Sequence, residues 1–116
     1  MNLTYTQIAT IHNGFNDLAN TKAPFKFCYA LNKNIQLVKK FVEKKDEEIS
    51  TIAKSANIEP NQFGMFDFTK NKDAFDSVNT FMKKEVEIEF YKVDAEVIKN
   101  MDLSANNLSC LEYMVD

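Results

Sequence analysis

The feature that most constrains how this chain folds is a series of apolar residues at helical spacing in its first half. Its members alternate steps of three and four residues, and one of them is charged. They are Cys28, Leu31, Ile35, Val38, Val42, Lys45, Ile49, Ile52 and Ala56. Because this spacing lines one side of a single helix, it predicts a long amphipathic helix, from about residue 25 to residue 57, that packs lengthwise against other helices.

A helix of this length does not fit inside a compact domain of 116 residues. At 1.5 Å per residue it makes a rod of about 50 Å, whereas a domain of this size has a radius of gyration of only about 13 Å. The far half of the rod therefore needs cover from later parts of the chain or from a second subunit. We take this overhang as an argument for a homo-oligomer.

Shorter helices are predicted before and after the long one. The first covers about residues 6–20 and ends before Pro24, because proline pushes the preceding residue out of the helical region. Its apolar residues are again three or four apart: Ile8, Ile11, Phe15 and Leu18. A third helix is expected after Asn71, and two short ones after Asp94 and Ser104, because all three residues are good helix caps.

Residues 85–91 have the alternation of a half-buried strand, with apolar residues on one face and glutamates on the other. Since a two-stranded ribbon alone is marginal in water, this strand is expected to pair with residues 2–5 or with a neighbouring protomer. A short extended run is also expected around Asp67. The predicted fold is a single domain, residues 1–116, mainly α with a small β element (α+β). It is a helical hairpin with one long amphipathic helix, followed by short strands and helices in the C-terminal half.

Charge and composition argue against several classes of protein. The net charge is −3, and all 14 basic residues are lysines. Without arginine the chain lacks the side chain that makes bidentate contacts to phosphate and guanine, so sequence-specific nucleic-acid binding is not expected. The first residues have no signal-peptide pattern, and no stretch has the roughly 20 apolar residues that cross a bilayer. We therefore expect an intracellular protein without a membrane partner.

The residues that usually carry catalysis are sparse. His12 is the one histidine, and no nucleophile or acid stands at a defined spacing from it. Cys28 and Cys110 are far apart and form no CxxC motif, so we expect two buried thiols rather than a metal or redox site. The glutamates of residues 85–89 could hold a hard cation, but a solvated strand face is the preferred interpretation. No enzyme activity, cofactor or metal is predicted.

A second stripe on the long helix is the candidate ligand site. Lys26, Tyr29, Lys33 and Lys40 fall at helical spacing on the side opposite the apolar series, and Lys22 precedes them. Ammonium groups neutralise phosphate, and a tyrosine ring can stack on a base. The alternative is a solvated helix face that carries one tyrosine.

Two stretches of the chain, LANTKAPFKFCYALNKNIQLVKKF and AFDSVNTFMKKEVEIEF, resemble a family of small proteins of unassigned function encoded by tailed phages. Lys26, Tyr29, Lys33 and Asn34 fit the family's pattern best, and Asn34 joins the candidate site for this reason. The resemblance implies a phage or prophage origin, hence the cytoplasm of a bacterial host. It implies no reaction.

These expectations together favour a non-enzymatic phage accessory protein that acts by stoichiometric binding. The preferred hypothesis is an inhibitor of host defence that captures a nucleotide signal or a host protein, with the lysine–tyrosine stripe lining a pocket at an oligomer interface. The alternative is a phage structural or assembly protein that acts like a chaperone, because a long seam helix and open strand edges also suit lattice contacts.

Overall fold

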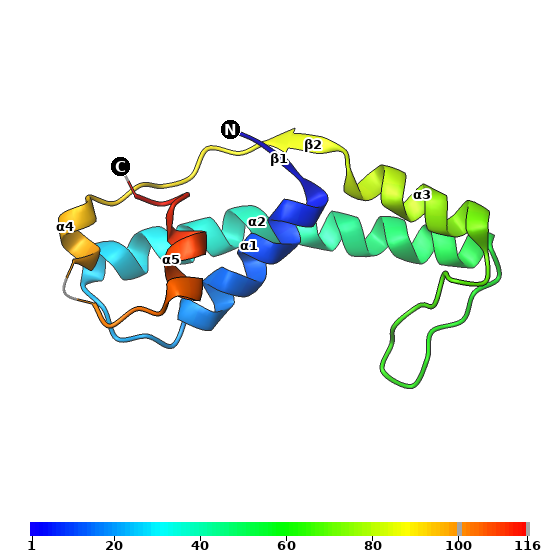
Figure 1. Cartoon of the computed structure of the whole chain (residues 1–116), viewed down its shortest axis with the longest axis horizontal. Helices are drawn as coiled ribbons and strands as arrows, with labels where there is room; N and C mark the ends of the chain where they lie inside the picture. Colours follow the sequence, from blue (N-terminus) through cyan, green and yellow to red (C-terminus); the bar gives the residue numbers. More distant parts are fainter. Residues whose placement is uncertain (100, 116) are drawn as a thin grey trace.

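The long helix is the spine of the molecule (Figure 1). The structure is a computed structural model that describes residues 1–99 and 101–115, and its helix α2 (Phe25–Ser55) spans 31 residues. The molecule measures 50 × 30 × 21 Å along its principal axes, with a radius of gyration of 16.7 Å. The predicted rod is therefore confirmed, and it makes the whole protein elongated.

The buried side of α2 is rotated slightly from the predicted one. Cys28, predicted to begin the apolar series, is exposed, and its thiol donates to the carbonyl of Ala23 at 3.6 Å. The buried residues of the helix are Phe27, Ala30, Leu31, Asn34, Val38 and Ala53. The prediction of a buried Cys28 was wrong because the larger Phe27, one position earlier, takes the inward direction and buries more apolar surface.

Helix α1 (Tyr5–Leu18) packs across the first half of α2 and forms the predicted helical hairpin with it. Thr4 and Gln7 close a capping box at its start, which satisfies backbone groups that would otherwise lack partners. Its four predicted core residues, Ile8, Ile11, Phe15 and Leu18, are all buried.

Helix α3 (Lys72–Met82) lies along the second half of α2 (Figure 1). The predicted cap is confirmed, because the Asn71 side chain accepts from the backbone N–H of Ala74 at 3.0 Å. Phe81 stacks on Tyr5 with ring centroids 4.4 Å apart and so joins α3 to α1. The chain thus covers the far half of its own rod, and the overhang no longer argues for a second subunit.

The sheet has two antiparallel strands, β1 (Asn2–Thr4) and β2 (Glu85–Glu87), with Leu3 opposite Val86. The predicted pairing with the N-terminal residues is confirmed, but the strand ends earlier than residue 91. Beyond Glu87, the N–H of Ile88 still donates to the Met1 carbonyl at 2.9 Å. The alternation persists beyond the strand, since Ile88 and Phe90 are buried and Tyr91 is exposed.

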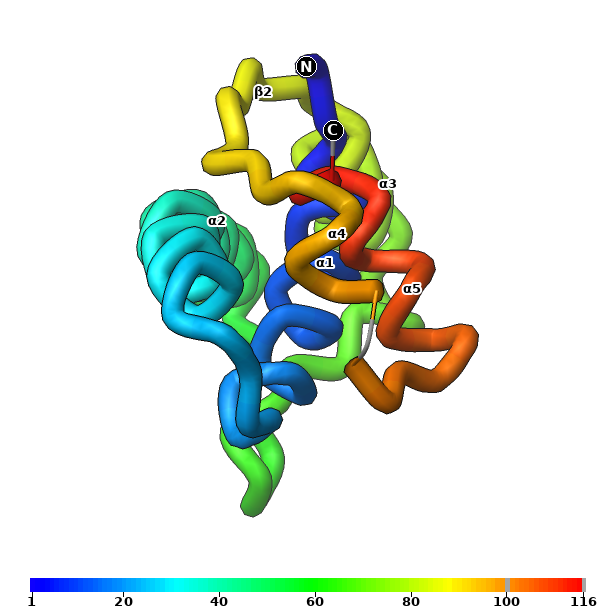
Figure 2. Tube along the Cα trace, turned by 90° about the vertical axis from the view of Figure 1, so that its left-hand side faces the viewer, coloured from blue at the N-terminus to red at the C-terminus, as the bar shows by residue number. Residues whose placement is uncertain are grey.

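Two short helices pack against the helical hairpin, one on α1 and one on α2. Asp94 and Ser104 cap α4 (Ala95–Ile98) and α5 (Ala105–Leu111) as predicted. Figure 2 shows α5 beside α1 and α4 between α2 and the C-terminal segment. Val93 donates to Met114 at 2.7 Å and bridges Val115, which closes the end of the core. The residues around Asp67, expected to be extended, belong to a loop.

Helices α1 and α5 meet at a glycine. A Cβ atom placed on Gly14 would lie 2.9 Å from the Cβ of Cys110 and 3.0 Å from its sulfur. Carbon atoms at such a distance are well inside van der Waals contact, so the two helices pack this closely because Gly14 has no side chain.

We predict that Gly14→Ala lowers the free energy of unfolding by about 1–2 kcal/mol. Overpacking costs about 1–3 kcal/mol, and the better helix propensity of alanine returns up to about 1 kcal/mol. Urea denaturation measures the difference. Asn13→Ala, on the exposed side of α1, is the control and should be neutral or mildly stabilising; equal stability of the two variants would contradict the close contact.

The two thiols should differ in reactivity. Cys28 is exposed, whereas Cys110 is 8% exposed and burial raises the pKa of its thiol, which disfavours the reactive thiolate. We predict that one thiol per chain of the native wild-type protein, that of Cys28, reacts quickly with a thiol reagent, and that the thiol of Cys110 reacts only in urea. Native Cys28→Ser should be nearly silent, and a fast reaction of this variant would contradict the burial of Cys110.

Candidate functional site

The first turns of α2 expose a row of residues at four-residue spacing, so that their side chains lie one above another on the helix surface. Phe25 is 79% exposed and Tyr29 is 52% exposed, and their ring centroids are 6.0 Å apart. The ammonium nitrogen of Lys33 lies 5.6 Å from the centre of the Tyr29 ring, within the range of a cation–π contact. Two of the predicted site residues, Tyr29 and Lys33, are therefore in contact.

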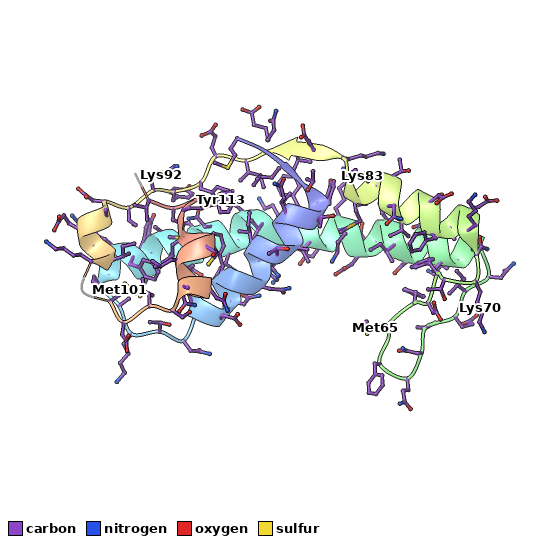
Figure 3. All side chains as sticks on the ribbon, in the orientation of Figure 1. Met65, Lys70, Lys83, Lys92, Met101 and Tyr113 are labelled. Carbon is purple, nitrogen blue, oxygen red and sulfur yellow. The ribbon has the colours of Figure 1, made fainter. Side chains whose placement is uncertain are left out.

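A second wall comes from the segment that leads from β2 into α4. Between this segment and α2 lies a groove of about 340 Å³. We call it the aromatic–lysine groove. Its lining residues are Phe25, Lys26, Tyr29, Ala30, Tyr91, Lys92, Val93, Asp94 and Val97. Lys92 is labelled on this segment in Figure 3. The sequence analysis did not predict this wall, although Tyr91 falls in phase with the exposed glutamates of residues 85–89.

Asn34 holds the second wall in place. Its side-chain NH₂ donates to the carbonyl of Tyr91 at 2.9 Å, and its side-chain oxygen accepts from the N–H of Tyr91 at 2.8 Å. Among the described residues it is the single fully buried polar side chain. Asn34, predicted to bind ligand, therefore does not lie on the exposed stripe. It supplies the backbone partner that the short β1 cannot offer to Tyr91.

The remaining predicted residues lie outside the groove. Lys22 lines a neighbouring hollow of about 650 Å³, which Glu96 and Asp102 also line. Lys40 follows Lys26 by 14 residues, which is about 21 Å along the helix. The structure thus brings Lys26 and Tyr29 into one groove, with Lys33 beside Tyr29. Lys22 lies in an adjoining hollow that shares Lys26 with the groove, and Lys40 lies away from both.

The groove carries an excess of positive charge. Ion pairs among residues 1–99 and 101–115 join Met1 to Glu89, Lys45 to Asp46 and Lys99 to Glu96, and none involves Lys26, Lys33 or Lys92. Asp94 is the one acidic lining residue, and its carboxylate already caps α4 by accepting from Glu96 N–H at 3.2 Å. An anion in the groove would meet lysines that are not paired within these ranges.

Other chemistry has less support in the part of the chain that the structure describes. No three His, Cys, Asp or Glu side chains there come together as a metal site, and His12 contacts Asn16 at 3.4 Å. No described helix is long and apolar enough to cross a membrane. Comparisons of the chain with protein families, with curated proteins and with solved structures find no match. The geometry of the groove therefore carries the functional argument.

We predict that Asn34→Ala destabilises the protein by about 2–4 kcal/mol, because each polar group left buried without its partner costs about 1–3 kcal/mol. Urea denaturation followed by circular dichroism measures the loss. Asn32→Ala changes an exposed asparagine of the same helix and should alter stability by less than about 0.5 kcal/mol. Similar values for the two variants would show that the contact to Tyr91 is not important for stability.

Proposed function

We propose that this protein acts by stoichiometric binding, and that the aromatic–lysine groove takes a ligand with a flat ring and an anionic group, of the nucleotide class. The supporting observation is that exposed aromatic rings line the same groove as ammonium groups that form no ion pair among residues 1–99 and 101–115. Stacking of a base on an aromatic side chain contributes about 1–3 kcal/mol, and lysine acts as a mobile point charge toward phosphate. Neither feature would select a nucleic-acid sequence.

The composition of the groove favours binding over turnover. Its lining has aromatic, aliphatic and lysine side chains with one capping aspartate, and no histidine, cysteine, serine or threonine of the described residues belongs to it. Nucleophile–base pairs are the usual basis of group transfer. With the resemblance to tailed-phage proteins, we propose an inhibitor of host defence that captures a nucleotide signal in the bacterial cytoplasm.

An assembly role is the second candidate. It is supported by the loop between α2 and α3, which exposes Phe63 and Met65, since apolar side chains raised on a loop suit a protein contact. Under this alternative the protein is a component of phage particles or of their assembly. Mass spectrometry of purified phage particles distinguishes the two candidate functions, because an inhibitor that captures a nucleotide signal should be absent from the particles.

We predict that at least one member of a panel of mononucleotides, cyclic mono- and dinucleotides and ADP-ribose binds with one site per chain and raises the melting temperature. Lys26→Ala/Lys33→Ala should weaken this binding at least tenfold, because each lost charged contact is worth about 1.5–3 kcal/mol. Affinity should also fall as salt rises. A thermal-shift assay measures the melting temperature, and isothermal titration calorimetry measures the affinity of the variant and its dependence on salt.

The matched control is Lys40→Ala/Lys44→Ala, which removes the same charge from the same helix outside the groove. It should bind like wild type. Equal weakening in both double variants would indicate general electrostatic attraction rather than a site, and a panel without any binding would contradict the nucleotide proposal.

A further inference from the structure

The loop that joins α2 to α3 stands off the body of the molecule, and Figure 3 shows Met65 on it. Phe63 is 77% exposed and Met65 is 66% exposed. Apolar side chains of this size raised on a loop are costly in water unless a partner covers them. Residues 61–65 are called the loop tip below.

The loop tip is a closed, hydrogen-bonded turn. The Asn61 side-chain oxygen accepts from the N–H groups of Phe63 and Met65 at 2.8 and 3.0 Å, and Asn61 N–H donates to the Met65 carbonyl at 2.8 Å. Gly64 has φ +75° and donates to the Asn61 carbonyl at 2.9 Å. This conformation suits glycine. These bonds fix the backbone that carries Phe63 and Met65, which reduces the backbone entropy lost on binding.

The aromatic–lysine groove complements the tip in shape and polarity. It is a concave surface of about 340 Å³, and its lining combines Ala30, Val93 and Val97 with the exposed rings of Phe25 and Tyr29. Aromatic rings pack well against phenylalanine and against methionine sulfur.

The charges around the two surfaces are opposite. The loop between α2 and α3, residues 56–71, carries Glu59, Asp67 and Lys70, a net charge of −1. The groove is lined by Lys26, Lys92 and Asp94, and Lys33 lies beside it. Asp67 accepts from the hydroxyl of Thr69 at 2.6 Å and from its N–H at 2.9 Å, and these bonds lower the pKa of its carboxyl. The loop thus has a small net negative charge and the groove a net positive one, and such complementarity favours association.

The loop cannot reach the groove of its own chain. The groove begins at the first turn of α2 and the loop follows its last turn, so the 31-residue helix separates them. This separation is about 46 Å. Figure 1 shows the loop at one end of the long axis and the start of α2 at the other. A second copy of the chain, in contrast, can bring its loop tip to this groove.

We propose that copies of this protein associate head to tail, with the loop tip of one copy seated in the aromatic–lysine groove of the next. Such a contact is heterologous and leaves one free tip and one free groove at the ends, so it extends until a ring closes or a filament grows. The tip and the proposed nucleotide use the same groove and exclude one another. The association itself does not depend on the nucleotide.

Light scattering coupled to size-exclusion chromatography, up to about 1 mM protein, tests the association, because small interfaces bind in the micromolar to millimolar range. The mass of the wild type should rise with concentration above the 13.4 kDa of one chain. The tip variant Phe63→Ser/Met65→Ser and the groove variant Tyr29→Ser/Tyr91→Ser should each stay at 13.4 kDa. Leu108→Ser, which removes an exposed leucine of α5, should assemble like wild type.

Mixing the two variants identifies the contact. The groove variant still has a tip and the tip variant still has a groove, so an equimolar mixture should form one junction and stop at twice 13.4 kDa. A wild type that stays monomeric, or a mixture that fails to form dimers while both variants melt like wild type, would overturn the proposal. No nucleotide is present in these experiments, so a failure of the chains to associate does not contradict the nucleotide proposal, which is tested separately by calorimetry.

Discussion

A single buried stripe on a 31-residue helix is the constraint on which the rest of this structure depends. No other helix of the described chain is long enough to cover it, so α1 covers the first half and α3 the second. The chain must then return from α3 to the start of α2, where α4 and α5 complete the core around α1. It does so along the segment after β2, and this returning segment forms one wall of the groove.

The returning segment depends on one side chain. β1 spans only Asn2–Thr4 and pairs with residues 85–87, so it does not supply backbone partners to Tyr91. Asn34 takes over this role by bonding both backbone groups of Tyr91 from inside the core. A buried amide is stable only when it is fully hydrogen-bonded, and here the same bonds fix where Tyr91 lies. Stability and groove shape are therefore set by the same contact.

Local patterns predicted most of the fold because its elements follow local rules. The spacing of Ile8, Ile11, Phe15 and Leu18 and the caps Asn71, Asp94 and Ser104 require only neighbouring residues. Three features could not be predicted in this way. Phe27 competes with Cys28 for the buried side, Asn34 acts on a residue 57 positions away, and Lys92 joins Lys26 only through the path of the chain. Each depends on tertiary contacts that no local period encodes.

The two proposals assign the same groove to a nucleotide and to the loop tip of a second copy, and this has a thermodynamic consequence. Ligands that exclude one another at a site are negatively coupled, and each lowers the apparent affinity of the other. At high protein concentration, tips of neighbouring copies would fill the grooves, and a nucleotide would have to displace them. At low concentration the grooves would be open, and capture would proceed at the intrinsic affinity. Under the two proposals the same exposed rings connect assembly to ligand binding, without any change in the conformation of a single chain.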